Sequence, residues 1–248
     1  HDHYQAGKYT FAMAEAPDEE KFEIESFPEV AFSKVKWPMS VLRLRSSDKA
    51  ALVTAAEHVL NTWKTYSNEE AEIIAFTGEE SHQTVTPIAR MRDGRFELDL
   101  VLRNNRTSEE HPMGVFHPHA DLHHIKKENI GLIEVMGLAV LPERLKHELQ
   151  QIEAFLLGEE AEVPKHHEEW VQHLFSKYQS FEKETADGIL KKEVGLKFSR
   201  VLEDAGVFKR TNEGNNHFNH FIQSLKRERN DKNENPSRND THTPAAKH

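Results

Sequence analysis

The feature that most constrains this chain is a pair of extended segments, residues 84–91 and 95–102, on either side of Asp93-Gly94. An Asp-Gly pair favours the positive backbone angles of a tight two-residue hairpin. The second segment alternates apolar and polar residues, as a half-buried strand does. Its apolar positions are Phe96, Leu98, Leu100 and Leu102. The pattern predicts an antiparallel pair of strands.

Helical periodicity follows elsewhere in the chain. Ser47 or Asp48 can cap a helix in which apolar residues recur at three- and four-residue spacing. Those residues are Leu52, Ala55, Ala56, Val59, Leu60 and Trp63. From residue 128 the pattern is mainly helical, with helices expected over residues 142–157, 164–181, 184–205 and 212–225. Further extended pieces are expected at residues 35–45 and 114–119. The sum is an α+β fold, an antiparallel sheet with helices packed on one side and a helical C-terminal region.

Composition excludes several classes of protein. A formal charge of −10 argues against a nucleic-acid binder, because affinity for a phosphate backbone rests on surplus Lys and Arg. No apolar run approaches the roughly 18 residues that cross a bilayer, so no membrane partner is expected and the cytoplasm is the expected location. The absence of cysteine excludes disulfides and thiolate-bound metal. The first residue is His1, so a fragment of a longer chain is expected.

The chain opens with His1-Asp2-His3-Tyr4-Gln5, in which three polar side chains stand at alternate positions. In a strand, alternate residues share one face about 7 Å apart. A neutral imidazole there can attack phosphorus, and an amide can donate hydrogen bonds to a phosphoryl oxygen. Spacing alone leaves open an exposed turn or a purification remnant.

The opening motif resembles the His-x-His-x-Gln signature of the histidine-triad superfamily, in the variant used by hexose-1-phosphate uridylyltransferases. Four further segments resemble the C-terminal domain of the second, mainly Gram-positive class of these enzymes. They are residues 36–40, 98–106, 114–137 and 202–208. The resemblance extends over about residues 1 to 225 and implies a sheet of histidine-triad type.

The resemblance implies the chemistry. His3 matches the nucleophile that takes the uridylyl group from UDP-glucose, after which galactose 1-phosphate attacks the uridylyl-histidine. His1 matches the residue that positions the backbone around His3, and Gln5 matches the contact to the phosphoryl group. The implied partners are the two substrates, the missing N-terminal half and a second subunit in a homodimer. No cofactor is expected.

His117-Pro118-His119 is a second histidine motif, and on a strand it would place two imidazoles on one face. In the first class of the family a His-x-His at this place helps to hold a structural metal with another histidine and a glutamate. Glu19 or Glu20 could match that glutamate, but residues 103–105 contain no histidine. We therefore expect no metal, and expect His117 and His119 to bond within the sheet or border a hexose-phosphate pocket.

Two basic pairs are candidate phosphate ligands. Lys126 and Lys127 lie beside His123 and His124 near an expected helix start, where backbone N–H groups favour anions. Arg103 and Arg106 offer guanidinium groups that grip two phosphate oxygens at once. Solvated surface is the competing interpretation of each pair. The histidines of the helical region are expected on the surface: His166, His167, His173, His217 and His220.

The expected domain organisation has three parts. Residues 1–46 would end the catalytic half, residues 47–226 would form the C-terminal uridylyltransferase domain, and residues 227–248 would be a disordered polar tail. The alternative to the enzyme is a non-catalytic module, either a histidine-rich metal binder or a truncated assembly surface.

Overall fold

The computed structural model describes residues 4–227 and contains a five-stranded antiparallel sheet in the order β1-β2-β3-β7-β6. Its strands are β1 (Asp18–Phe22), β2 (Ala31–Val35), β3 (Val41–Ser46), β6 (Gln83–Arg92) and β7 (Arg95–Asn104). A separate small hairpin joins β4 (Phe76–Thr77) to β5 (Glu80–Ser81). The expected hairpin is confirmed, with positive φ at Asp93 and Gly94 (50° and 73°). Strands on both sides of residue 46 pair in this one sheet.

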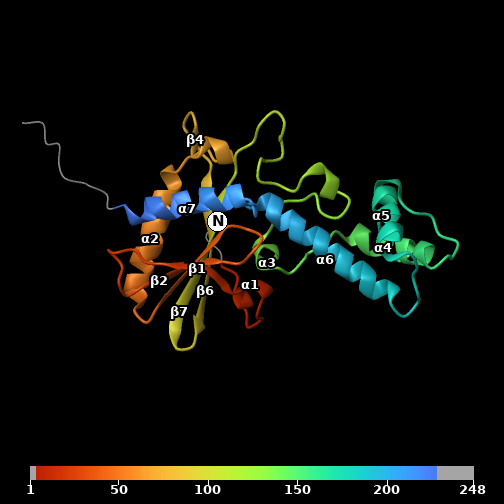
Figure 1. Cartoon of the computed structure of the whole chain (residues 1–248), viewed down its shortest axis with the longest axis horizontal. Helices are drawn as coiled ribbons and strands as arrows, with labels where there is room; N and C mark the ends of the chain where they lie inside the picture. Colours follow the sequence, from red (N-terminus) through yellow and green to blue (C-terminus); the bar gives the residue numbers. More distant parts are fainter. Residues whose placement is uncertain (1–3, 228–248) are drawn as a thin grey trace, which may run out of the picture.

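One face of the sheet is covered by α2 (Lys49–Thr65) and α7 (Asn212–Lys226) (Figure 1). The side chain of Asp48 caps α2 by accepting hydrogen bonds from the amides of Ala50 and Ala51. Leu42, Leu44, Leu100 and Leu102 of the sheet pack against the stripe of α2 predicted from the sequence. Trp63 of that stripe is fully buried, and its indole N–H donates to the carbonyls of Thr84 and Arg103.

The opposite face of the sheet is part apolar and part charged. Its apolar part packs against α1 (Ala12–Glu15), α3 (Leu132–Val135) and the C-terminal end of α6 (Ala186–Ala205). In its charged part, Arg43 is 1% exposed and pairs with Asp99 at 2.6 Å. Arg43 also donates to the carbonyls of Met13 and Ala16, which ties the N-terminal segment to the sheet. The predicted α+β fold is confirmed.

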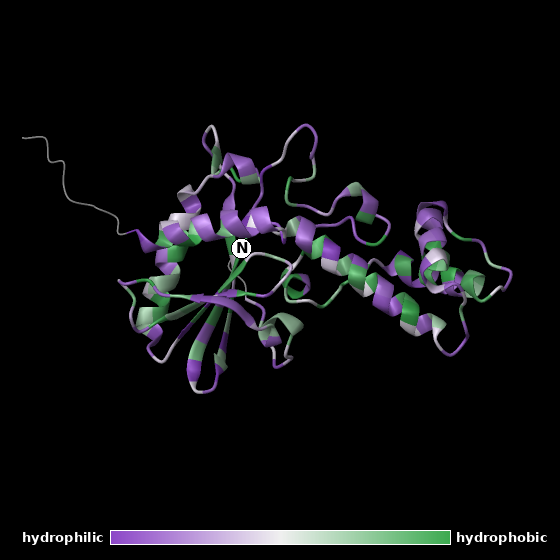
Figure 2. Cartoon of the chain, viewed as in Figure 1, coloured by the Kyte–Doolittle hydropathy of each residue, from purple (hydrophilic) through white to green (hydrophobic). Residues whose placement is uncertain are grey.

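A helical unit lies at the far end of α6 from the sheet (Figure 1). It contains α4 (Glu143–Leu156) and α5 (Glu168–Tyr178), which pack against the N-terminal half of α6 around their own apolar cluster. Figure 2 shows the hydrophobic side of α6 running along the helix between the two parts. Three short 3-10 helices complete the described chain: η1 (Glu69–Ala71), η2 (Ala120–Leu122) and η3 (Lys165–His167).

Three expectations from the sequence are wrong. Residues 114–119 form turns instead of a strand, because Gly114 adopts a φ of 129° and Pro118 has no N–H to donate. Residues 128–141 contain only the four-residue α3. His167 and His217 are buried instead of exposed, because each is hydrogen-bonded to a polar partner, Glu148 and Asn68 respectively. His166, His173 and His220 are exposed as expected.

No helix within residues 4–227 is long and apolar enough to cross a membrane. The expected tail begins at residue 227, and residues 228–248 lie outside the described part of the chain.

Candidate functional site

A cavity of about 390 Å³ opens where β7 ends and the following loop turns back over the sheet. Its polar lining comes from the end of β7, from the turn around His117 and from the loop before α3. The polar residues of the lining are Arg103, Asn104, Asn105, His117 and Asn129. Two of these residues, Arg103 and His117, are among the substrate-binding residues predicted from the sequence.

Arg103 places an unneutralised cation in this cavity. Alternation along β7 puts its side chain on the same face as Asp99 and Val101, and its Nη1 donates to the carbonyl of Ile130 at 3.1 Å. Within residues 4–227, no carboxylate lies within 4 Å of its guanidinium. Burial lowers the pKa of Arg103, which reflects the cost of holding a charge without a counterion. An anionic ligand would supply the missing charge.

His117 contributes a neutral imidazole. The residue is 6% exposed, and burial is the main cause that lowers its pKa. Its Nδ1 lies 3.1 Å from the carbonyl oxygen of Pro118, so the proton belongs on Nδ1. Its Nε2 is buried and has no hydrogen-bond partner within residues 4–227. The lone pair of Nε2 is therefore available to accept a hydrogen bond, for example from a hydroxyl group.

The two asparagines at the end of β7 have different tasks. Asn104 is buried and donates to the carbonyl of Ile74 and the amide oxygen of Gln83, so it holds the end of the strand in place. Asn105 is exposed, and its backbone N–H bonds to the carbonyl of His82. Asn105 lines the cavity, and within residues 4–227 its side chain forms no hydrogen bond, so it is available to a ligand. Neither asparagine was singled out in the sequence, because no periodicity marks a residue at the end of a strand.

The other predicted residues of this group lie outside the cavity. His119 lines a second, smaller cavity, where its ring stacks on that of His111 with the centroids 5.4 Å apart and its backbone N–H donates to the carboxylate of Asp204. Arg106 forms an ion pair with Glu72 at 3.5 Å. Lys126 is buried and pairs with Glu134 at 2.9 Å, and its neighbour Lys127 is exposed.

The structural metal of the first class of the family does not fit these residues. His117 and His119 line different cavities, and within residues 4–227 neither belongs to a group of three or more converging His, Asp or Glu side chains. Of the two candidate glutamates, Glu19 is bound by both guanidinium nitrogens of Arg210, and Glu20 pairs with Lys34 at 3.0 Å. Each carboxylate already has its cation.

The predicted catalytic motif lies at the edge of the described chain. His1 and His3 fall outside the described residues. Gln5 is described and is exposed, and within residues 4–227 its side chain forms no hydrogen bond. The chain then enters the fold at Met13, whose carbonyl is held by Arg43.

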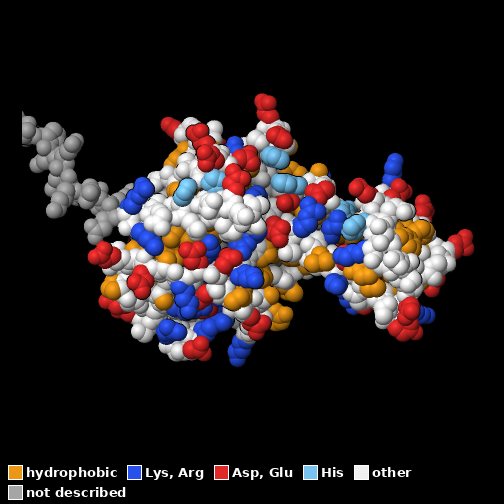
Figure 3. Space-filling model, viewed as in Figure 1, with side chains coloured by type: hydrophobic (Ala, Val, Ile, Leu, Met, Phe, Trp, Pro, Cys, Tyr) orange, Lys and Arg blue, Asp and Glu red, His pale blue; other side chains and the backbone are white. Residues whose placement is uncertain are grey.

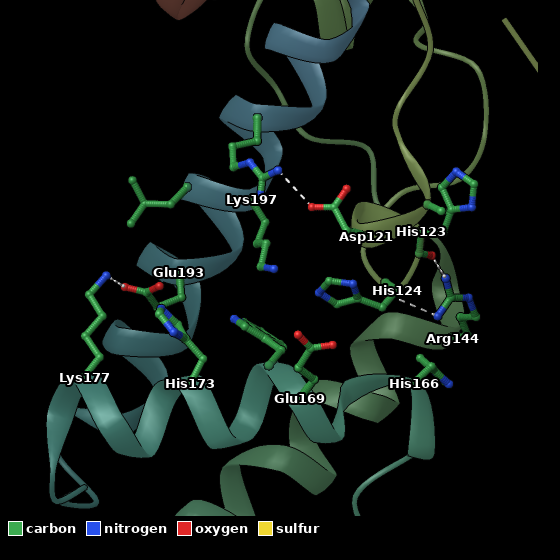
Figure 4. A pocket seen from close by; sticks show the side chains of 14 residues that line it. Asp121, His123, His124, Arg144, His166, Glu169, His173, Lys177, Glu193 and Lys197 are labelled. Atoms are coloured by element: carbon green, nitrogen blue, oxygen red, sulfur yellow. Dashed lines mark hydrogen bonds and ion pairs between the residues drawn. The ribbon is translucent and has the colours of Figure 1, made fainter. Parts of the chain in front are cut away.

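A larger cavity of about 810 Å³ lies where α5 faces the middle of α6, beside η2 and the start of α4. Figure 3 shows histidine and basic side chains together near this junction. The lining includes Asp121, His124, Glu169 and Lys197, which point toward a common space in Figure 4. Of these residues, only His124 was near a site predicted from the sequence.

Comparison with known proteins identifies the family. The C-terminal domain of the galactose-1-phosphate uridyl transferases matches residues 1–172. Galactose-1-phosphate uridylyltransferases from Clostridium acetobutylicum, Ligilactobacillus salivarius and Streptococcus pneumoniae are 51%, 50% and 52% identical over 91% of this chain. The chain spans 46% of each of these relatives, about half of their length. No solved structure matches significantly. The chain belongs to the galactose-1-phosphate uridyl transferase family, and its match is to the family's C-terminal domain.

Proposed function

We propose that this chain is the C-terminal half of an enzyme that transfers UMP from UDP-glucose to galactose 1-phosphate. The observation that carries the proposal is the identity of 50% to 52% to three galactose-1-phosphate uridylyltransferases over 91% of the chain. Sequence identity of this extent supports the same reaction for the enzyme to which this chain belongs. The missing half of the length would supply the groups that bind uridine.

The proposed reaction has two displacements at one phosphorus atom. In the first, a ring nitrogen of His3 attacks the α-phosphorus of UDP-glucose, a P–N bond forms, and glucose 1-phosphate leaves with the electron pair of the broken P–O bond. In the second, a phosphate oxygen of galactose 1-phosphate attacks the same phosphorus, and the P–N bond breaks to restore the imidazole. Because both halves exchange similar bonds, neither is strongly uphill.

Gln5 and His1 assist this chemistry. An amide N–H of Gln5 donates to a phosphoryl oxygen and stabilises its charge without adding a fixed cation. The exposure of Gln5 is compatible with this role, because its side chain has no competing bond within residues 4–227. His1 positions the backbone that orients His3.

The cavity at the end of β7 is proposed to bind the hexose phosphate. Arg103 offers an unneutralised cation to the phosphate, and Nε2 of His117 accepts a hydrogen bond from a sugar hydroxyl. The amide of Asn105 can serve a second hydroxyl. Substrate roles for Arg106, His119, Lys126 and Lys127 stay predictions. A homodimer and a cytoplasmic location also belong to the proposal.

Isotope exchange tests the function. The complete enzyme, with the N-terminal half attached, is incubated with UDP-glucose and radiolabelled glucose 1-phosphate, without galactose 1-phosphate. A covalent intermediate predicts that label enters UDP-glucose, that His3→Asn abolishes the exchange, and that His220→Asn, which alters an exposed histidine of α7, leaves it unchanged. The 248-residue chain alone is expected to be weak or inactive. A non-catalytic module would give no exchange with any of these proteins.

A further inference from the structure

Three metal-ligating side chains converge in the helical unit, away from the cavity at the end of β7. Glu148 comes from α4, and His166 and His167 come from η3. Nε2 of His166 lies 3.2 Å from Oε1 of Glu148, and Nε2 of His167 lies 2.9 Å from Oε2. One ligand atom from each residue can be chosen so that all lie within 4.8 Å of one another.

Burial suits the cluster to metal binding. The side chain of His167 is fully buried and that of Glu148 is 13% exposed, while that of His166 is 48% exposed and leaves the cluster open to solvent on one side.

We propose that Glu148, His166 and His167 form a binding site for one divalent transition-metal ion of the zinc type. A zinc ion binds nitrogen and oxygen ligands at about 2.0–2.2 Å. When the angle between two such bonds at the ion lies between 90° and the tetrahedral value, the nitrogen and the oxygen are about 2.9–3.4 Å apart. The separation of each imidazole nitrogen from its nearest carboxylate oxygen falls in this interval, 3.2 Å from His166 to Oε1 and 2.9 Å from His167 to Oε2 of Glu148. The inference is independent of the proposed uridylyl transfer.

Arg144 supports the carboxylate of this site. Its Nη1 donates to Oε2 of Glu148 at 2.8 Å, which fixes the carboxylate and leaves Oε1 beside His166 for a metal ion. Carboxylates that bind metals are commonly oriented by such hydrogen bonds. Arg144 itself is held by the carbonyls of His123 and His124, as drawn in Figure 4.

His124 provides an acceptor for the buried ring nitrogen of His167. With a metal on Nε2, the Nδ1 of His167 carries a proton, and a ligating histidine normally donates that proton to an acceptor. Neither Nδ1 of His167 nor Nε2 of His124 has a hydrogen-bond partner within residues 4–227. The centroids of the two rings are 5.3 Å apart, so His124 is the neighbouring imidazole that could accept this proton.

The site has an open side. Three protein ligands leave one position of a tetrahedral ion for water or a small ligand. His166 and Arg144 line the cavity of about 810 Å³, so this position would be reached from the cavity. Joining α4 to the start of α5 would also cross-link two elements of the helical unit.

Zinc binding to the chain itself tests the proposal. Protein stripped with a chelator is titrated with Zn²⁺, and metal per chain is measured by mass spectrometry after gel filtration. His166→Ala is the main variant, because this exposed side chain can be removed without leaving a hole in the core. His173→Ala is the matched control, an exposed histidine of α5 that lines the same cavity but lies outside the cluster.

The expected result is one Zn²⁺ that is retained by the wild type and by His173→Ala and is lost, or weakened at least about tenfold, in His166→Ala and Glu148→Gln. When Co²⁺ replaces Zn²⁺, the wild type and His173→Ala should show the visible absorption band of a low-symmetry, four-coordinate site, and His166→Ala and Glu148→Gln should not. Equal retention by wild type and His166→Ala would overturn the proposal, as would a wild type that retains no metal. Neither measurement depends on uridylyl transfer, so the two proposals can fail separately.

Discussion

At the residue scale, the cavity at the end of β7 depends on a guanidinium that no carboxylate within residues 4–227 neutralises. Arg103 loses hydrating water on burial, and within residues 4–227 its guanidinium gains only one hydrogen bond, to the carbonyl of Ile130. Such a charge is costly unless a ligand completes it. The nearby arginines of the same sheet face differ in this respect, because Arg43 and Arg90 each pair with Asp99.

Replacement of Arg103 should therefore weaken substrate binding more than the fold. In the complete enzyme, Arg103→Met is expected to raise the KM for galactose 1-phosphate about ten- to hundredfold, the loss of a charge-assisted hydrogen bond. The stability should fall little, because no ion pair is broken. Arg95→Met, at the exposed start of the same strand, should leave KM unchanged. Equal KM values for the two variants would remove Arg103 from the site.

His117 should make the stability of the chain depend on pH. Burial lowers its pKa in the folded state below the value of 6.5 that it has when unfolded, so the unfolded chain binds the proton more readily. The contribution of the neutral His117 to the free energy of unfolding is complete above pH 6.5, and it is lost as the pH falls toward the folded-state pKa. Urea unfolding between pH 7.5 and pH 5 should show a smaller decline for His117→Gln than for wild type. A decline that is equally reduced by His220→Gln would refute this assignment.

At the scale of elements, the sheet holds the N-terminal segment through buried charge. Asp99 is fully buried and receives Arg43 and Arg90, while Arg43 grips the carbonyls of Met13 and Ala16. This arrangement fixes α1 and therefore the direction from which residues 4–12 leave the fold. The proposed catalytic motif is thus connected to the sheet by a buried ion network.

Removing a member of that ion network should lower the free energy of unfolding. Asp99→Asn takes from the buried Arg43 its closest carboxylate, and from the partly buried Arg90 one of its two carboxylate partners, which costs about 3–5 kcal/mol of unfolding free energy. Asp187→Asn removes an exposed pair with Lys191 and should cost about 0.5 kcal/mol or less. Urea denaturation measures both values. Similar losses in the two variants would show that the buried pairing is unimportant.

The sequence predicted the elements whose signals are local. Asp93-Gly94 fixed the hairpin, and Asp48 with the stripe ending at Trp63 fixed α2, because turn chemistry and helical spacing act between near neighbours. The turns of residues 114–119 were missed, because neither the positive φ of Gly114 nor the bond from the backbone N–H of His119 to the distant Asp204 leaves a periodic pattern in the sequence. Arg103 was named together with Arg106, and His117 together with His119, but the meeting of Arg103 and His117 in one cavity follows from the fold of residues 104–130. Burial of His167 was missed because its partner, Glu148, lies 19 positions earlier.

At the scale of the whole molecule, α6 joins two apolar cores. Phe198, Val201 and Leu202 belong to the core beneath the sheet, whereas Leu190 and Val194 belong to the core of the helical unit. Apart from α6, only Leu141 among residues 4–227 packs against both cores, and cores with so little in common can open separately, because unfolding one exposes little of the other. The cavity of about 810 Å³ lies at this junction.

Hydrogen exchange should show the separation. Leu174 is fully buried in the core of the helical unit, and Leu174→Ala should cost about 2–5 kcal/mol there. Amides of α4 and α5 are then expected to exchange faster, while those of β3 and β7 keep their wild-type rates. Faster exchange throughout residues 4–227 would mean that the molecule unfolds as one unit.

The most direct test of the central claim is the mass of the peptide that contains His3. After the complete enzyme is incubated with UDP-glucose alone and digested, this peptide should carry one added UMP, stable in base and lost in acid. Addition of galactose 1-phosphate should remove the adduct and release UDP-galactose. Active enzyme whose UMP adduct lies on another residue, or that forms no adduct, would contradict the account.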